Sequence, residues 1–101
     1  MSSDHRFYEG FLLLEKEDGT LESKYYKLVN RELLEFRNAS DDKYTSLKYL
    51  GHEAFVVEEG RKLGEYYKFT LQTGTEILSF CTESEESHDY WVEGLKKAVG
   101  E

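Results

Sequence analysis

The sequence predicts a mainly β fold with a single C-terminal helix, and three observations support this prediction. Seven short runs rich in Tyr, Phe, Leu and Val follow one another at close spacing, separated by residues typical of turns. The first eighty residues contain no proline, no low-complexity linker and no helical periodicity. After Ser84 the pattern changes to that of an amphipathic helix. Closely spaced strands of this kind are typical of a sandwich or a barrel.

Turn signals set the boundaries of the predicted strands. Asp18-Gly19 is the strongest signal, and we expect a type I′ hairpin turn there with positive φ at both residues. Gly60–Gly64 is expected to interrupt the strands, and Thr73-Gly74 to turn the chain again. The predicted strands are therefore Phe7–Glu15, Lys24–Val29, Leu33–Phe36, Lys43–Leu50, Ala54–Val57, Glu65–Leu71 and Thr75–Thr82.

The last segment carries the start and stop signals of a helix. Ser84 is a favourable N-cap, Glu85-Glu86 suits the positive end of the helix dipole, and Lys96-Lys97 lies near the other end. Gly94 weakens such a helix by about 1 kcal/mol relative to alanine, so packing must stabilise it. One buried face is predicted from the i, i+3, i+4, i+7 spacing of His88, Trp91, Val92, Leu95, Ala98 and Val99.

Length and composition indicate one folded domain. The 101 residues suffice for a single core, with an ordered part expected over about residues 7–99, and 39% are hydrophobic. The single cysteine, Cys81, and the absence of a signal-peptide pattern favour a cytoplasmic protein. The formal net charge of −8 repels phosphate backbones, which argues against nucleic acid as a partner.

The candidate catalytic and metal-binding residue types do not form a recognisable site. His5, His52 and His88 have no metal-ligand spacing among themselves or with Cys81. The acidic segment Glu83–Asp89 lacks the ligand spacing of a calcium loop, and helix capping explains it. We therefore expect no enzyme activity, no catalytic residue, no metal site and no cofactor.

Several short motifs resemble the pleckstrin homology (PH) domain family. The most specific is Trp91, seven residues after the serine cap of the final helix and behind a strand that contains Phe80. The other matching motifs are Glu9-Gly10-Phe11-Leu12, Lys24-Tyr25-Tyr26-Lys27-Leu28, Leu34-Glu35-Phe36 and Trp91-Val92-Glu93-Gly94-Leu95. The resemblance runs from about Phe7 to Val99. It implies a seven-stranded, strongly bent antiparallel barrel or sandwich with the C-terminal helix capping one end.

The resemblance also implies where a lipid headgroup would bind. Lipid-binding PH domains carry a lysine four residues after the glycine of the first strand, and a Lys/Arg-x-Arg pair in the second. Here the corresponding residues are Leu14, Glu22 and Lys24, and Arg37 matches a further basic position more loosely. Losing two of three charge-assisted contacts costs roughly 3–6 kcal/mol, or about two to four orders of magnitude in affinity. From residue 6 to residue 37 the chain has six basic and seven acidic residues.

The leading hypothesis is a non-catalytic interaction module of a signalling or cytoskeletal protein, cut from a longer chain. Its main partner would be another protein or a neighbouring domain, with at most weak phosphoinositide binding, and an open edge beside the fifth strand could dock a partner strand. The alternative is peripheral binding to phosphoinositides or other anionic lipids through Lys16, Lys24, Lys27 and Arg37, which would place a cytoplasmic protein transiently at the inner membrane surface. A phosphotyrosine-binding domain has the same architecture, but it would need an arginine-lined pocket, and no arginine follows Arg61.

Overall fold

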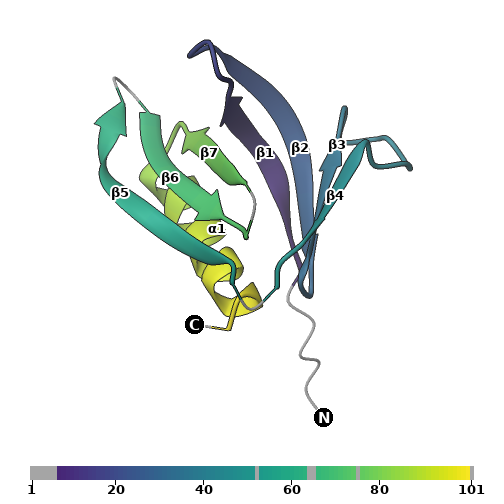
Figure 1. Ribbon diagram of the computed structural model, residues 1–101. Coiled ribbons are helices and arrows are strands. Elements are labelled where there is room, and N and C mark those ends of the chain that lie inside the picture. The colour runs from purple at the N-terminus through teal and green to yellow at the C-terminus, as the bar shows by residue number, and fades with distance from the viewer. Residues whose placement is uncertain (1–6, 52, 64–65, 75, 101) are drawn as a thin grey trace.

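The computed structural model describes residues 7–51, 53–63, 66–74 and 76–100. Within these ranges the chain forms seven strands followed by one helix, which confirms the predicted fold class (Figure 1). The elements are β1 (Phe7–Glu15), β2 (Leu21–Val29), β3 (Glu32–Phe36), β4 (Ser46–Tyr49), β5 (Phe55–Leu63), β6 (Tyr66–Gln72), β7 (Ile77–Thr82) and α1 (Glu85–Ala98).

All seven strands belong to one sheet, in which neighbouring strands are antiparallel. The strand order is β4-β3-β2-β1-β7-β6-β5, so β4 and β5 lie at the two ends of the sheet. The sheet curls into a half-barrel, with β1 to β4 on one side and β5 to β7 on the other (Figure 1). The helix α1 packs against β5, β6, β7 and β1. The open edge beside the fifth strand that the sequence predicts is therefore present at β5.

The core fills the space between the curled sheet and α1. Strands alternate side chains between two faces, and on β2 this places Tyr26 and Leu28 together on the inner face. Phe69 of β6, Phe80 of β7 and Trp91 of α1 are at most 1% exposed and belong to the same cluster. Burying each such side chain stabilises the fold by about 1.5–3 kcal/mol. One buried cluster therefore contains side chains from both sides of the half-barrel and from α1, and it stabilises their packing.

The helix has the cap and the buried face that its sequence predicts. The Ser84 Oγ accepts a hydrogen bond from the backbone N–H of Ser87 at 3.1 Å, which satisfies one of the free donors of the first turn. The predicted apolar face is buried at His88, Trp91, Val92, Leu95 and Ala98, and Val99 packs partly buried against the core.

The hairpin between β1 and β2 is present, but its predicted turn type is wrong. Gly19 has a φ of 88°, whereas Asp18 is not among the described residues with positive φ. The loop is longer than a two-residue turn: the Lys16 carbonyl accepts from the Gly19 N–H at 2.9 Å, and the Lys16 N–H donates to the Thr20 carbonyl at 2.8 Å. The Asp18 carboxylate accepts from both the backbone N–H and the hydroxyl of Thr20, which stabilises this longer loop.

The predicted interruption at Gly60–Gly64 is also wrong over its described part. Residues 60–63 belong to β5, which continues to pair with β6 as far as Leu63↔Tyr66. The register shifts between Glu58 and Lys62, so the glycine lies within an irregularity of the strand and does not end it. Gly64 lies outside the described residues, as do Glu65 and Thr75 at the starts of two predicted strands.

Two further strands, β2 and β4, begin three residues away from their predicted starts, and smaller differences occur at the ends of other strands. β2 begins at Leu21, because Leu21 already pairs with Glu15 across the hairpin. β4 covers only Ser46–Tyr49, because turns precede it, including one closed by the Asp41 N–H donating to the Asn38 carbonyl. The Thr45 N–H then donates to the Glu35 carbonyl at 2.7 Å and leads the chain into β4.

Candidate functional site

The candidate site is the end of the half-barrel formed by the β1–β2 loop and the neighbouring residues of β2 and β3. Lys24 lies two residues before Tyr26 on β2, so both side chains are on the inner face of the sheet. Tyr26 pairs with Glu35 of β3, which brings the Glu35 carboxylate to the same region. Strand register thus places acidic and basic side chains together where the PH-like resemblance implies a headgroup site.

Four charged side chains form a continuous chain of ion pairs, which we call the rim network: Lys16, Glu22, Lys24 and Glu35. The Lys16 Nζ lies 2.9 Å from the Glu22 Oε1. The Lys24 Nζ lies 3.6 Å from the Glu22 Oε2 and 3.4 Å from the Glu35 Oε2. Lys24 therefore stands between two carboxylates, and its positive charge is already balanced within the protein.

Hydrogen bonds hold Glu35 in this position. The Tyr26 hydroxyl donates to the Glu35 Oε1 at 2.9 Å, and the Thr45 hydroxyl donates to the Glu35 Oε2 at 3.2 Å. The Tyr26 ring is buried, and its burial, followed by the nearby Glu35 charge, raises the pKa of the Tyr26 hydroxyl. The hydroxyl therefore stays protonated and remains a donor to the carboxylate.

The outer pair of the rim network also favours its charged forms. The hydrogen bond from Lys16, with the charges of Lys16 and Lys24, holds the pKa of Glu22 below its usual value. The same hydrogen bond raises the pKa of Lys16. Glu22 is therefore an ionised carboxylate near neutral pH, and it adds a negative charge where a lipid-binding PH domain has a basic residue.

The structure does not bring all four predicted lipid-contact residues together. Lys16 and Lys24 meet through Glu22, whereas Lys27 projects from the opposite face of β2. The Lys27 Nζ lies 5.0 Å from the centroid of the Phe36 ring, in a cation–π contact. Arg37 lines a separate shallow pocket in the β3–β4 connection, together with Asp41, Asp42, Lys43, Tyr44 and Thr45.

The acidic residue Glu22 beside Lys24 is visible in the sequence, whereas the residues that support the rim network are not. Thr45 lies within the predicted strand Lys43–Leu50, but the sequence does not show that it contacts Glu35. Lys48 of β4 pairs with Glu76 of the β6–β7 connection at 2.6 Å, and this contact was also missed. The cross-strand neighbours of Glu35 could have been found from register, but the loop contacts could not.

The described residues contain neither a metal-binding cluster nor a membrane-spanning helix. No group of three or more His, Cys, Asp or Glu side chains in this part of the chain is arranged to hold a metal ion. No described helix has the length and apolar character needed to cross a membrane.

Comparison with known proteins identifies the family. The family model of the PH domain matches residues 6–100. A search of curated proteins found no match. Among solved structures, the Slm1 PH domain in complex with phosphoserine has a TM-score of 0.80 and 27% identity, covering 93% of this chain and 95% of that chain.

Two other solved structures show the same fold. The Slm1 PH domain in complex with inositol-4-phosphate has a TM-score of 0.77 and 28% identity, over 92% of this chain and 94% of that chain. The PH domain of mouse Ethanol Decreased 4 protein has a TM-score of 0.80 at 16% identity, over 99% of this chain and 92% of that chain. Since the family match spans nearly every residue and the half-barrel with its helix agrees, the chain belongs to the PH domain family.

Proposed function

We propose that this PH domain is a non-catalytic interaction module that mainly contacts other proteins and has at most weak affinity for phosphoinositides. The observation that carries this proposal is the rim network, in which Lys24 lies between the carboxylates of Glu22 and Glu35. A polyanionic headgroup would have to displace those carboxylates or accept their repulsion. Each converging charge-assisted bond that is lost lowers binding by about 1.5–3 kcal/mol.

Exposed apolar side chains on several elements support a protein-contact role. Leu47 and Tyr49 are exposed on β4, and Phe55 is exposed on β5, so both end strands of the sheet carry apolar side chains beside free backbone edges. Such edges accept an added strand from a partner. The large exposed apolar residues of the described chain are Phe11, Tyr44, Leu47, Tyr49, Phe55, Ile77 and Tyr90.

The environments of Cys81 and His88 support the non-catalytic part of the proposal. Burial raises the pKa of the Cys81 thiol, and a nucleophilic cysteine requires a lowered one. The His88 ring is buried on α1 near Phe69 and Tyr67, and its Nδ1 lies 3.0 Å from the Asp89 Oδ1. Both groups therefore serve the packing of the helix and sheet.

Peripheral binding to an anionic membrane is the second candidate function. It is favoured by the Slm1 PH domain, which was solved with inositol-4-phosphate, and by Lys27 and Arg37, which form no ion pair within the described ranges. Each basic residue near an anionic leaflet contributes about 1 kcal/mol. If vesicles recruit the domain in this way, exchanging Lys24 and Arg37 for glutamate abolishes recruitment. Unchanged recruitment would exclude these residues as the contact.

Vesicle sedimentation with charge-matched variants separates the two candidates. The rim variant Glu22→Gln/Glu35→Gln removes both carboxylates around Lys24. The control variant Glu58→Gln/Glu93→Gln removes two carboxylates that pair with Lys96 and Lys97 of α1, so both variants lose the same charge. Sedimentation is measured with vesicles containing a few per cent of one phosphoinositide, at low and moderate salt.

The proposal makes a definite prediction for each protein in this assay. We expect the unmodified domain and the control variant to stay unbound at moderate salt. We expect the rim variant to bind about tenfold more strongly or better, because two lysines are released at about 1 kcal/mol each. Strong binding of the unmodified domain to one phosphoinositide isomer would overturn the proposal.

A further inference from the structure

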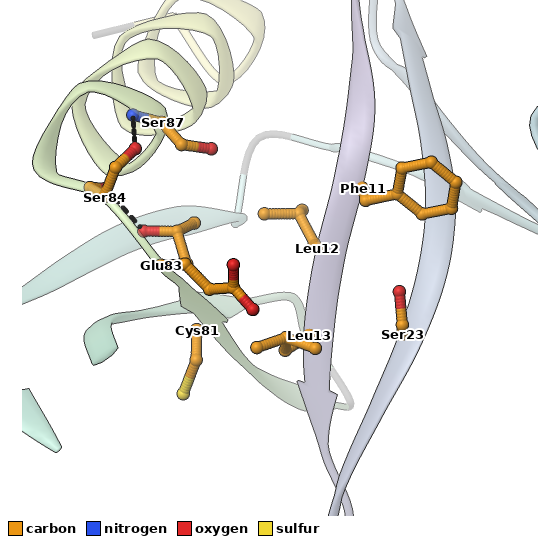
Figure 2. A pocket seen from close by; sticks show the side chains of 9 residues that line it. Phe11, Leu12, Leu13, Ser23, Cys81, Glu83, Ser84 and Ser87 are labelled. Carbon is orange, nitrogen blue, oxygen red and sulfur yellow. Dashed lines mark hydrogen bonds between the residues drawn. The ribbon is translucent and has the colours of Figure 1, made fainter. Parts of the chain in front are cut away.

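A groove on the outer face of the sheet, away from the rim network, has the properties of a side-chain binding site. It has a volume of about 280 Å³ and lies between β1 and β2 on one side and the end of β7 and the start of α1 on the other. β1 pairs with β7 only at Leu13↔Cys81 and Leu14↔Phe80, and beyond these pairs the two strands separate. The groove opens in this gap, and Leu13 and Cys81 are among the residues that line it (Figure 2).

One wall of the groove carries the Phe11 ring, which packs against Tyr25 outside the groove. Phe11 is 55% exposed, and its ring lies edge-on to Tyr25, with centroids 5.0 Å apart. The Tyr25 hydroxyl donates to the Glu9 Oε1 at 2.9 Å, and the Glu9 N–H donates to the Tyr90 hydroxyl at 3.1 Å. β1, β2 and α1 are thereby linked, so a large exposed ring is kept in place beside the groove.

The opposite wall presents a carboxylate without a partner. The Glu83 side chain extends from the β7–α1 junction toward β1 (Figure 2), and it forms no hydrogen bond or ion pair with the residues described. The backbone on either side of it is fixed: the Thr82 hydroxyl donates to the Ser84 carbonyl at 3.0 Å, and the Ser84 Oγ caps α1. The Glu9 carboxylate, by contrast, is already engaged by Tyr25.

Charge determines which kind of ligand fits this groove. From Glu83 to Leu95 the chain carries five acidic residues and no lysine or arginine. Glu85 and Glu86 lie in the first turn of α1 and offset the positive end of the helix dipole, so an anion is disfavoured. The volume is below the range of about 300–1,000 Å³ typical of small-molecule sites, but it accommodates one long side chain.

We infer that this groove binds an arginine side chain of an extended basic segment in a partner protein. A guanidinium is planar and forks onto a carboxylate while it stacks on an aromatic ring, and Glu83 and Phe11 supply both surfaces. The alkyl part of the side chain would cover the partly exposed Leu13 side chain. This inference rests on the proposed protein-contact function, and it specifies an arginine side chain as one group of the partner that the domain binds.

Titration with a matched pair of peptides tests the inference. The probe is a synthetic peptide in which three arginines are separated by Gly-Ser pairs, and its control has citrulline, the neutral isostere, at the same positions. Backbone amide signals of the whole domain are followed by NMR. We expect saturable shifts at Leu13, Cys81, Ser84 and Ser87 with the arginine peptide and none with the citrulline peptide.

Variants of the two walls identify the contact. Glu83→Gln should weaken arginine-peptide binding about tenfold or more, because a charge-assisted bond is lost. Phe11→Ala should weaken it about twofold to fivefold, because an exposed cation–π contact is lost. Glu93→Gln removes a carboxylate paired with Lys97 elsewhere on α1 and should leave binding unchanged. Thermal unfolding of each variant verifies that the domain is folded.

Three outcomes would overturn the inference. They are shifts that map away from the groove, binding that Glu83→Gln does not weaken, and saturable binding of inorganic phosphate at the same amides. Failure to bind the arginine peptide at millimolar concentration has the same consequence. None of these outcomes alters the vesicle result, so failure of this inference is distinguishable from failure of the proposed protein-contact function.

Discussion

At the scale of single residues, Gly94 explains how closely α1 approaches β1. A Cβ atom at this position would lie 2.8 Å from ring atoms of Tyr8. The Tyr8 ring also makes an edge contact with Tyr90, with centroids 4.9 Å apart. Alanine is the better helix former by about 1 kcal/mol, but here the packing of the Tyr8 ring requires glycine. The sequence predicted that packing must compensate for Gly94, and this contact supplies the reason.

We predict that Gly94→Ala destabilises the domain although it raises helix propensity. Forcing a methyl group against the Tyr8 ring should lower the free energy of unfolding by about 1–3 kcal/mol. Chemical denaturation measures the change, and Glu93→Ala, an exposed neighbour on α1, serves as the control with an expected effect within about 0.5 kcal/mol. A higher unfolding midpoint for Gly94→Ala would contradict the account of this contact.

The hydroxyl of Tyr26 is the second residue whose role can be isolated. It donates to the Glu35 carboxylate from a buried ring. Tyr26→Phe should therefore lower the free energy of unfolding by about 1.5–3 kcal/mol, since a hydrogen bond to a charged acceptor is lost. Tyr25→Phe removes the hydrogen bond from Tyr25 to Glu9, which is exposed, and should have a smaller effect. Equal stability of Tyr26→Phe and the unmodified protein would show that the bond does not hold Glu35.

At the scale of elements, the β1–β2 hairpin is stabilised by two carboxylates at its tip. Hydrogen bonds from the Thr20 hydroxyl and backbone N–H lower the pKa of Asp18. The hydrogen bond from Lys16, followed by its charge, lowers the pKa of Glu22. A group whose pKa is lower in the folded state stabilises that state above its unfolded pKa, and this contribution disappears as pH falls through the folded pKa.

The hairpin should therefore loosen in acid. We predict that Asp18 and Glu22 titrate below their ordinary values of 3.8 and 4.5, and that their stabilising contribution falls as pH drops below about 4.5. Carboxyl carbon chemical shifts recorded against pH measure both pKa values. Thr20→Val should return Asp18 toward its ordinary value and leave Glu22 unchanged. Ordinary pKa values at both positions in the unmodified protein would contradict the described contacts.

Among the strands and the helix, features set by local sequence patterns were predictable, whereas features set by pairing between strands were not. Alternation predicts the inner face of β2, and helical spacing predicts the buried face of α1, because both patterns are local. The continuation of β5 through Gly60 could not be predicted, since it depends on pairing with β6 across a register shift. The predicted turn type was wrong because the Asp18 carboxylate accepts a hydrogen bond from the Thr20 N–H and stabilises a longer loop.

At the scale of the whole molecule, the family and the fold were predictable, but the arrangement of the site was only partly so. The replacement of basic residues by Leu14 and Glu22 is visible in the sequence. The position of Lys24 between two carboxylates depends on the register of β2 and β3 and on the β3–β4 connection. The net charge of −8 creates a field that repels anionic ligands. Within the rim network, the carboxylates of Glu22 and Glu35 add repulsion directly beside Lys24.

Titration of the unmodified domain with soluble inositol-1,4,5-trisphosphate, followed by amide NMR at about 0.1 M salt, tests the central claim most directly. At this ionic strength the Debye length is about 10 Å, so distant charges are screened and the result reports on the rim itself. The account predicts no saturable shifts at Lys16, Glu22, Lys24 or Glu35 up to millimolar ligand. Saturable shifts at these residues with a micromolar dissociation constant would contradict it.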